Sequence, residues 1–170
     1  LLDQPGWSDE NFKAIKERGG INLTGRDQVG FAPAPICTTD FEEAISKAQI
    51  IFITALSTRH HELAKEVVPY LVDGQVVIVS AGNLGSLVFR KTLQEIGSKA
   101  EVVIGELEGN MFPCRLRPGA EAFIGLPFKP KTVAAFPAKD NDKLVKALGE
   151  IYEAHPAKNI METYLNSSNL

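Results

Sequence analysis

The sequence predicts an α/β fold: a doubly wound, mostly parallel sheet of the Rossmann type with helices on both faces. Three runs, 50–53, 76–79 and 102–104, are apolar at every position rather than at alternate ones. Strands of this kind are expected when helices cover both faces of a parallel sheet. Apolar residues recur at helical spacing between the runs, so strands and helices alternate along the chain, as in α/β proteins.

The first 35 residues give weaker signals than the rest of the chain. Residues 1–3 are typical of the end of an apolar strand. Ser8 is a candidate cap for a helix, which Gly19-Gly20 can end by supplying a left-handed turn. An extended stretch is expected at 21–24, and the following Pro33 favours a loop or an edge strand.

From Asp40 onward the patterns are sharper. Asp40 and Glu43 form a pair typical of a helix start, followed by apolar residues at helical spacing as far as Ala48. The strand at 50–53 precedes a second helix that ends or bends at Pro69. A turn containing Gly82 and Gly85 follows the strand at 76–79, and the third helix carries Phe89, Leu93 and Ile96.

The pattern changes after the third apolar run. A loop-rich stretch contains Pro113, Pro118 and Gly119, and strands are expected near 122–124 and 132–136. One last helix closes the recognisable domain and carries on one face Leu144, Val145, Leu148, Ile151 and Tyr152.

Composition excludes several classes of function. The 170 residues, 44% of them hydrophobic, are enough for the core of one domain. A net charge of -3, with 18 basic residues scattered among 21 acids, gives no attraction for nucleic acid or an anionic membrane. No run has the length of a membrane span and no signal peptide is recognisable, so a cytoplasmic location is expected. Cys37 and Cys114 have no partner at metal-ligand spacing, which predicts free thiols and no metal site.

The fold class indicates where a ligand binds. In doubly wound sheets the ligand lies beyond the carboxyl ends of the strands, where backbone N–H groups at helix starts are free. This rule selects Asp3, the turn Ala55-Leu56-Ser57, the segment 80–83 with Ala81, Gly82 and Asn83, and Glu106. A carboxylate at Asp3 can accept hydrogen bonds from ribose hydroxyls and repel a 2′-phosphate, which favours NAD over NADP. The alternative interpretation is that Asp3 is an ordinary solvated acid at the end of a strand.

Four further residues have two interpretations each. His60 and His61 could donate to a phosphate or a substrate, or be exposed in a surface turn, and no acid or nucleophile completes a triad with them. Arg115 and Arg117 could hold a substrate carboxylate through bidentate hydrogen bonds, or belong to a solvated loop.

Beyond these patterns, the run from Ala48 to the end of the chain resembles the opine dehydrogenases, the octopine and nopaline dehydrogenase group. The similarity extends over nearly the whole sequence. Its most specific parts are the His60-His61 pair, Gly82 ahead of the helix with Phe89-Arg90, the stretch 106–115, and the segment 165–169.

The resemblance implies an NAD(P)-dependent reaction. In this reaction the amine of an amino acid condenses with a 2-oxo acid, and the resulting imine is reduced to a secondary amine dicarboxylate. NAD is the expected cofactor and NADP the alternative. The resemblance assigns Ala55, Leu56 and Ser57 to the ribose and pyrophosphate, and Ala81 and Gly82 to the nicotinamide. His60 and Asn83 are further cofactor-binding candidates. The candidates on the substrate side are Glu106, Arg115, Asn166 and Asn169.

Two departures from the family pattern limit the assignment. No GxGxxG turn occurs, so the first strand and its glycine-rich turn are expected to precede Leu1. The family's catalytic His and helical substrate domain are expected to follow Leu170. Residues 1–157 are therefore predicted to be a partial dinucleotide-binding domain and 158–170 the start of the connection. We assign no catalytic residue, and expect the 170-residue piece alone to be inactive with little NAD affinity.

Two other functions stay open at this point. One is another two-domain dehydrogenase, such as glycerol-3-phosphate dehydrogenase or ketopantoate reductase. The other is a nucleotide-sensing module without catalysis. The sequence leaves open which amino acid and 2-oxo acid are used, and also the oligomeric state, for which a homodimer is the candidate.

Overall fold

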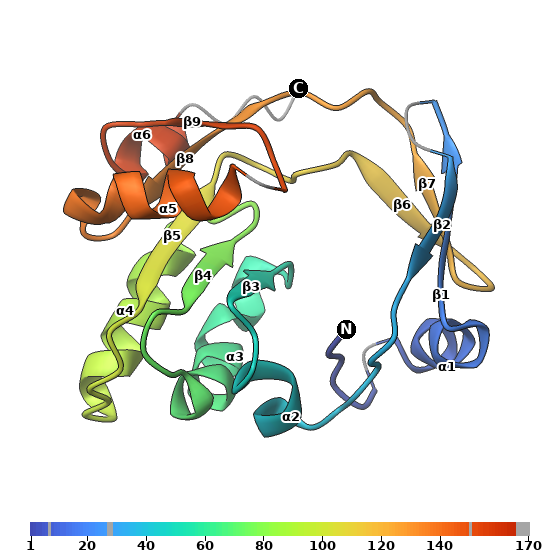
Figure 1. Cartoon of the computed structure of the whole chain (residues 1–170), viewed down its shortest axis with the longest axis horizontal. Helices are drawn as coiled ribbons and strands as arrows, with labels where there is room; N and C mark the ends of the chain where they lie inside the picture. The colour runs from blue at the N-terminus through green and yellow to red at the C-terminus, as the bar shows by residue number, and fades with distance from the viewer. Residues whose placement is uncertain (7, 27–28, 150, 166–170) are drawn as a thin grey trace. The chain divides into compact units, whose positions relative to one another are not determined.

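The computed structural model describes residues 1–6, 8–26, 29–149 and 151–165 (Figure 1). The chain divides into two compact units. Leu1–Ala44 and Phe112–Lys129 form the first unit, and the second comprises Ile45–Met111 and the chain from Pro130 onward.

The first unit contains a four-stranded sheet and one long helix. Its elements are α1 (Asp9–Arg18), β1 (Gly20–Gly25), β2 (Gly30–Pro33), β6 (Cys114–Arg117) and β7 (Glu121–Ile124). The strand order is β2-β1-β7-β6, with β1 parallel to β7 and the other two pairs antiparallel. β2 is an edge strand, one of the two predicted alternatives for the segment around Pro33. β6 was not predicted, and its stretch was expected to be rich in loops. Its pairing with β7 is a tertiary contact that the flanking prolines do not indicate.

The start of α1 differs from the prediction in one detail. Ser8 occupies the cap position, but its side chain makes no hydrogen bond to the helix. The hydroxyl instead donates to the carboxylate of Asp3. The other end is as predicted, because Gly19 ends the helix with a positive φ of 75°.

The second unit has the alternating pattern predicted from the sequence. The helix α2 (Phe41–Ile45) spans the boundary, since all but its last residue belong to the first unit. The main elements of the second unit are β3 (Ile50–Ile53), α3 (His60–Val67), β4 (Val76–Val79), α4 (Gly85–Glu95), β5 (Val103–Leu107), β8 (Lys131–Ala135), α5 (Asn141–Leu148), β9 (Ala154–Pro156) and α6 (Ile160–Leu165). Short 3₁₀ turns are η1 (Ser57–Arg59), η2 (Val68–Tyr70) and η3 (Ala138–Asp140). The strand order is β3-β4-β5-β8-β9, and only the β5–β8 pair is antiparallel. The predicted doubly wound, mostly parallel fold is confirmed.

The register of the sheet assigns side chains to its two faces. Val79 of β4 pairs with Glu106 of β5, and Ile78 with Gly105. Gly105 lies against Leu144 of α5, whereas Val79 lies against Gly85 at the start of α4. Because successive residues of a strand point to opposite faces, α4 and α5 cover opposite faces of the sheet (Figure 1). All four residues of β4 are buried, as expected for a central strand.

Several boundaries were predicted less well. The strand predicted at 102–104 continues to Leu107, so Glu106 lies within it. The last helix predicted from the sequence, α5, ends at Leu148, which leaves Ile151 beyond it and 57% exposed. β9 was not predicted, because a three-residue strand containing a proline has little signal of its own.

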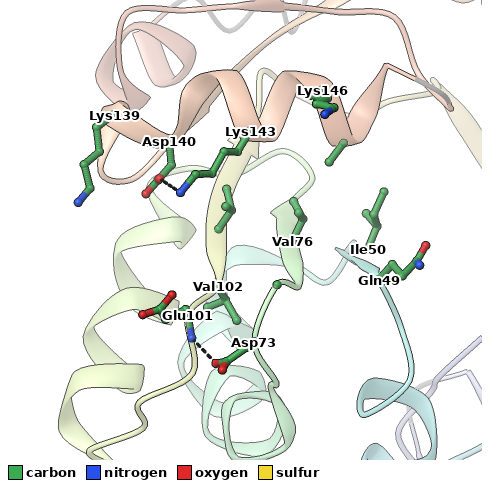
Figure 2. A pocket seen from close by; sticks show the side chains of 13 residues that line it. Gln49, Ile50, Asp73, Val76, Glu101, Val102, Lys139, Asp140, Lys143 and Lys146 are labelled. Atoms are coloured by element: carbon green, nitrogen blue, oxygen red, sulfur yellow. Dashed lines mark hydrogen bonds and ion pairs between the residues drawn. The ribbon is translucent and has the colours of Figure 1, made fainter.

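An open cleft of about 910 Å³ lies at the amino ends of the parallel strands (Figure 2). Its lining includes Ile50 and Val76 at the starts of β3 and β4. Lys139, Lys143 and Lys146 lie along its α5 side, and Asp140 forms an ion pair of 2.9 Å with Lys143. Doubly wound folds bind their ligands at the opposite, carboxyl end of the strands, so this cleft is not the candidate site.

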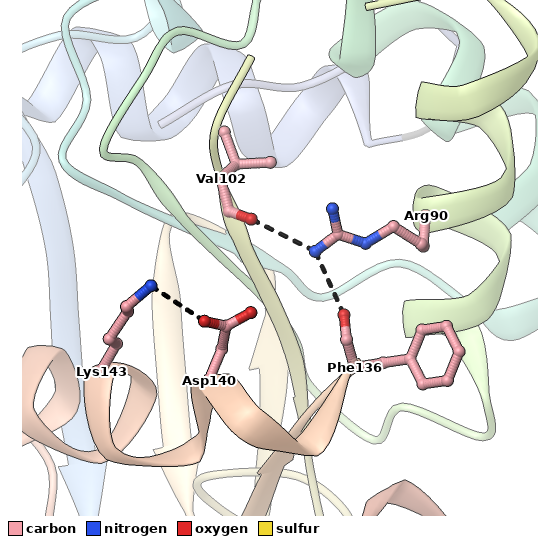
Figure 3. Close-up of polar contacts among 5 residues, drawn as sticks. All are labelled: Arg90, Val102, Phe136, Asp140 and Lys143. Carbon is pink, nitrogen blue, oxygen red and sulfur yellow. Dashed lines mark hydrogen bonds and ion pairs between the residues drawn. The ribbon is translucent and has the colours of Figure 1, made fainter. Parts of the chain in front are cut away.

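Two polar side chains hold the elements of the second unit together. The Arg90 guanidinium donates to the carbonyls of Val102 (3.2 Å) and Phe136 (3.1 Å), which joins α4 to the start of β5 and the end of β8 (Figure 3). Burial lowers the pKa of the Arg90 guanidinium below its usual value. Asn141 accepts from the Ala135 N–H at 2.7 Å and donates to the Ala157 carbonyl at 2.8 Å.

Candidate functional site

Three segments of the second unit meet at the carboxyl edge of its parallel strands. The turn after β3 begins at Thr54, the turn after β4 contains Ala81, and Glu106 lies near the end of β5. Because the three strands are parallel and in register, these segments are neighbours on one edge of the sheet. The structure therefore brings together most of the residues that the sequence selected.

The turn after β3 presents an apolar side chain to solvent. Leu56 is 77% exposed, and Ser57 after it is also exposed and begins η1. Ala55 is half-buried, and its carbonyl points to the ring of His60, with 3.1 Å between the carbonyl oxygen and Nε2. An exposed leucine at this edge offers apolar surface that a planar ligand can cover.

His60 is not the exposed surface histidine that one interpretation of the sequence expected. Its side chain is only 2% exposed and packs edge-on against Phe89, with 6.4 Å between the ring centroids. Burial is the main cause that lowers the pKa of His60 below 6.5, against opposing effects of the Ala55 carbonyl and Glu106. The ring is therefore neutral near pH 7, and the carbonyl requires Nε2 to carry the proton. His60 supports the β3 turn from below, while His61 is exposed.

The turn after β4 has an unusual backbone. Ala81, Asn83 and Leu84 have positive φ values of 53°, 45° and 65°. Non-glycine residues adopt this region rarely, and such strain persists where the surrounding structure enforces it, often at binding sites. The Ala81 N–H donates to the Gly109 carbonyl at 2.6 Å, and the Gly82 N–H to the Leu107 carbonyl at 3.3 Å.

Gly82 allows this turn to lie directly on the side chain of Glu106. A Cβ atom at Gly82 would lie 2.3 Å from the Cβ of Glu106, so no larger residue fits without movement. The glycine is therefore required for this close approach of the turn to Glu106. Asn83, next in the turn, is exposed.

Glu106 is a buried carboxylate, only 1% exposed. Its Oε2 accepts hydrogen bonds from the N–H (3.2 Å) and the hydroxyl (2.7 Å) of Ser86, in the first turn of α4. Its Oε1 lies 3.4 Å from the hydroxyl of Thr163 on α6. A negative charge at a helix N-terminus is stabilised by the free N–H groups and the helix dipole. Glu106 thus fills the position that an anion would take at α4.

Behind the β4 turn is a small polar hollow of about 10 Å³, roughly the space of one water molecule. It is lined by Ala81, Gly82, Asn83, Glu106, Leu107, Gly109, Thr163 and Tyr164. The hollow is far smaller than the cleft at the amino ends, but it lies where the fold class predicts chemistry.

Asp3 and Arg115 belong to the first unit. Asp3 follows Leu2, which forms a parallel bridge with Thr38, so the expected strand end at residues 1–3 is present as a single bridge. The Asp3 carboxylate is half-buried and accepts the hydroxyl of Ser8. Arg115 lies on β6 with its Nη1 3.2 Å from the Cys114 carbonyl, and its side chain is exposed.

Arg117, the other candidate for a substrate carboxylate, has partners within its own sheet. It forms an ion pair of 2.9 Å with Glu121 and covers the ring of Phe123 at 4.1 Å. Hydrogen bonds from Thr24 and Arg117 lower the pKa of Glu121. Neither arginine lies in a loop, because both are in β6. Asn166 and Asn169 lie outside the described residues.

The sequence analysis missed polar residues that the fold buries beside the site. Ser86 (0% exposed) and Thr163 (2%) flank Glu106. Glu108 is also buried, and its Oε2 accepts the Thr132 hydroxyl at 2.7 Å. Burial, with a smaller effect of Glu108, raises the pKa of Tyr152 to about 12. Two acids separated by one residue at the end of an apolar run were a signal that could have identified Glu108.

The cysteines and the other possible metal ligands form no cluster in the described part of the chain. Cys37 and Cys114 are each a free cysteine. Among residues 1–6, 8–26, 29–149 and 151–165, no three His, Cys, Asp or Glu side chains are grouped as a metal site. Within the same ranges, no helix has the length and apolar character needed to cross a bilayer.

The sheet order and the polar turns at its carboxyl edge define the class of the second unit as a Rossmann-type α/β domain. Comparison of sequences finds an opine dehydrogenase of Arthrobacter sp. (strain 1C) that is 28% identical over 162 residues, covering 94% of this chain and 45% of the relative. The resemblance to opine dehydrogenases is thereby confirmed. The chain spans less than half the length of this relative, and no family model matches it.

Solved structures show the same fold. An octopine dehydrogenase with NADH and pyruvate aligns with a TM-score of 0.75 at 17% identity, over 98% of this chain and 45% of its own. A yersinopine dehydrogenase with NADP⁺ gives 0.70 at 16% identity, over 98% and 43%. A 2-dehydropantoate 2-reductase from Enterococcus faecalis gives 0.65 at 15% identity, over 96% and 50%.

Proposed function

We propose that this chain is the greater part of the dinucleotide-binding domain of an NAD(P)-dependent opine dehydrogenase. The observation that carries the proposal is the 28% identity to an opine dehydrogenase over 94% of the chain. The reaction would join the amine of an amino acid to a 2-oxo acid and reduce the imine, or run in reverse. In the proposed division, residues 1–157 bind the dinucleotide and 158–170 begin the connection to a substrate domain.

The carboxyl edge of the second unit is suited to a dinucleotide. Exposed Leu56 and Ser57 would contact the ribose and pyrophosphate, and His60 would act indirectly by holding the Ala55 carbonyl. Gly82 carries no side chain and packs closely on Glu106, and we propose that this turn forms the wall beside the nicotinamide. The bound dinucleotide would supply the hydride.

NAD is the proposed cofactor and NADP the alternative. A carboxylate at a strand end can bind two ribose hydroxyls and repels a 2′-phosphate, which is the role proposed for Asp3. Its partner among the described residues is the Ser8 hydroxyl, which donates to one of the carboxylate oxygens. The similar solved structures include both forms, since the octopine dehydrogenase was solved with NADH and the yersinopine dehydrogenase with NADP⁺.

On the substrate side, the residues of this chain would bind and orient. Arg115, exposed on β6, offers a guanidinium for a substrate carboxylate. Asn166 and Asn169 would hydrogen-bond a substrate from the connection to the next domain. Glu106 is buried and already accepts two hydrogen bonds, so we propose that it supports the nicotinamide turn rather than touching substrate. No residue of this chain is proposed as the catalytic acid or base.

A second candidate is a ketopantoate reductase or a related two-domain dehydrogenase, because a 2-dehydropantoate 2-reductase shares the fold with a TM-score of 0.65. Such enzymes reduce a single carbonyl substrate without an amine. The requirement for an amino acid therefore distinguishes the two functions.

The test is NADH and NADPH oxidation by the full-length protein with a panel of 2-oxo acids, each alone and each paired with the common amino acids. The proposal expects oxidation that needs both partners and a secondary-amine product seen by mass spectrometry. Oxidation with ketopantoate alone would favour the second candidate, and nucleotide binding without any turnover a sensing module. Cell fractionation and size-exclusion chromatography test the predicted cytoplasmic location and the homodimer.

A further inference from the structure

Below the turn after β4, polar side chains connect three elements. Ser86 in the first turn of α4 donates both its N–H and its hydroxyl to Oε2 of Glu106 on β5. Oε1 of the same carboxylate faces the hydroxyl of Thr163 on α6 at 3.4 Å. All three side chains are at least 98% buried. α4 and α6 are thus linked through one carboxylate.

A buried carboxylate requires several hydrogen bonds to be stable. Removing a charge from water is costly unless donors replace the water, and a carboxylate can accept about four hydrogen bonds. Ser86 supplies two of them, both at Oε2. At Oε1 the described residues supply the Thr163 hydroxyl at 3.4 Å, and the same hydroxyl oxygen lies 2.7 Å from the Ile160 carbonyl, so its single proton is shared between the two acceptors. Among the described residues, Thr163 is therefore the side chain that faces the second oxygen and can fix its orientation.

The orientation of Glu106 decides the shape of the turn above it. Gly82 rests on the Glu106 side chain, and a Cβ at Gly82 would be 2.7 Å from its carboxyl carbon. The neighbouring residues Ala81 and Asn83 have left-handed backbone conformations that need support from below. Rotation of the carboxyl group would remove that support and let the turn relax.

We propose that Thr163 is a positioning residue: through Glu106 it holds the Ala81-Gly82-Asn83 turn in the shape that receives the nicotinamide. α6 thereby couples its own position to cofactor affinity, although Thr163 does not contact the cofactor. This inference rests on the proposed function.

The experiment measures the Kd of NADH and NADPH by fluorescence titration of the full-length protein. Thr163→Val keeps the shape and removes the hydroxyl, and Thr163→Ser restores the hydroxyl. Met161→Ala, at an exposed position of the same helix, is the matched control. Loss of this shared hydrogen bond predicts a rise in Kd of roughly 2- to 10-fold for Thr163→Val. Thr163→Ser should recover most of the affinity, and Met161→Ala should not change it.

A positioning role is separated from a purely structural one by which constants change. The nucleotide Kd should rise in Thr163→Val, while the KM values for amino acid and 2-oxo acid at saturating nucleotide stay unchanged. A lower melting temperature with an unchanged Kd would overturn the inference. If Thr163→Val does not fold, Ser86→Ala tests the same carboxylate from α4, and an unchanged Kd there would also overturn it. Absence of nucleotide binding by the unsubstituted protein would overturn the proposed function, and this inference with it.

Discussion

Replacing Gly85 with alanine tests the packing of the two turns against each other. A Cβ at Gly85 would lie 2.5 Å from Nδ1 and 2.8 Å from Cε1 of His60, and 2.9 Å from Cγ1 of Val79. Gly85 needs no left-handed backbone, so the substitution acts through space alone. The added methyl group can be accommodated only if the His60 ring moves and the Val79 side chain shifts slightly.

The cost of this movement follows from the contacts of the ring. Carbon atoms pack at about 3.5–4.0 Å, so the ring must shift by roughly 1 Å. It is held by Phe89 on one side and by the Ala55 carbonyl at 3.1 Å on the other. Overpacking of this kind costs about 1–3 kcal/mol, and a weakened hydrogen bond about 0.5–1.5 kcal/mol. The higher helix propensity of alanine returns at most about 1 kcal/mol. We expect a net loss of about 1–3 kcal/mol.

The assay is a double-mutant cycle on the full-length protein. Urea unfolding followed by circular dichroism gives the free energy of unfolding for Gly85→Ala, for His60→Ala and for the double variant. His60→Ala alone leaves a cavity and should cost about 2–3 kcal/mol. In the double variant the methyl group enters that cavity. The double variant should therefore be more stable than the sum of the two single losses predicts, by at least about 1 kcal/mol.

Additive losses within about 0.5 kcal/mol would refute this reasoning, because they would mean that Gly85 and His60 do not compete for the same space. A Gly85→Ala variant as stable as the unsubstituted protein would refute it as well.

Three other substitutions test separate parts of the second unit. Burial holds the pKa of His60 below 6.5, so the unfolded chain gains a proton that the folded chain lacks as the pH falls below 6.5. The stability that the neutral ring provides above pH 6.5 is then lost, by at most about 1.4 kcal/mol per pH unit. In urea unfolding, the difference in free energy of unfolding between the unsubstituted protein and His60→Ala should therefore be smaller at pH 5.5 than at pH 7.5. Arg90→Met removes the donor from two backbone carbonyls and should lower the free energy of unfolding by about 1–3 kcal/mol. An unchanged melting temperature would show that these two hydrogen bonds do not stabilise the fold. Asn141→Ala leaves the Ala135 N–H and the Ala157 carbonyl unpaired, and a loss of about 1–3 kcal/mol in thermal unfolding is expected; equal stability would contradict it.

The strands and helices of the second unit could be predicted because their signals are local. Runs apolar at every position identified β3, β4 and most of β5, and helical spacing identified α3, α4 and α5. β6 and β9 could not be predicted, since each is short and carries or adjoins proline. They exist because partner strands are in place to pair with them. Pairing across long sequence separation has no counterpart in local sequence pattern.

Within the candidate site, the sequence located the turns but not their support. The rule that ligands lie at the carboxyl ends of strands selected Ala55, Gly82 and Glu106, and the fold places all three on one edge. The burial of His60 and the roles of Ser86 and Thr163 were not predicted. A polar residue on an amphipathic helix is usually solvated, and only the packing of α4 and α6 buries these two hydroxyls.

By itself, the sequence determined the alternation of elements, the parallel sheet and the edge at which a ligand is proposed to bind, because apolar periodicity and turn residues act over a few neighbours. The tertiary structure alone decided the antiparallel β5–β8 pair, the left-handed turn at Ala81, and the contact of Glu106 with Ser86 and Thr163. Each of these depends on contacts between groups 20 or more residues apart in the sequence. Such groups exclude water from one another only when the elements pack, so their contribution to the free energy of folding has no local sequence signal.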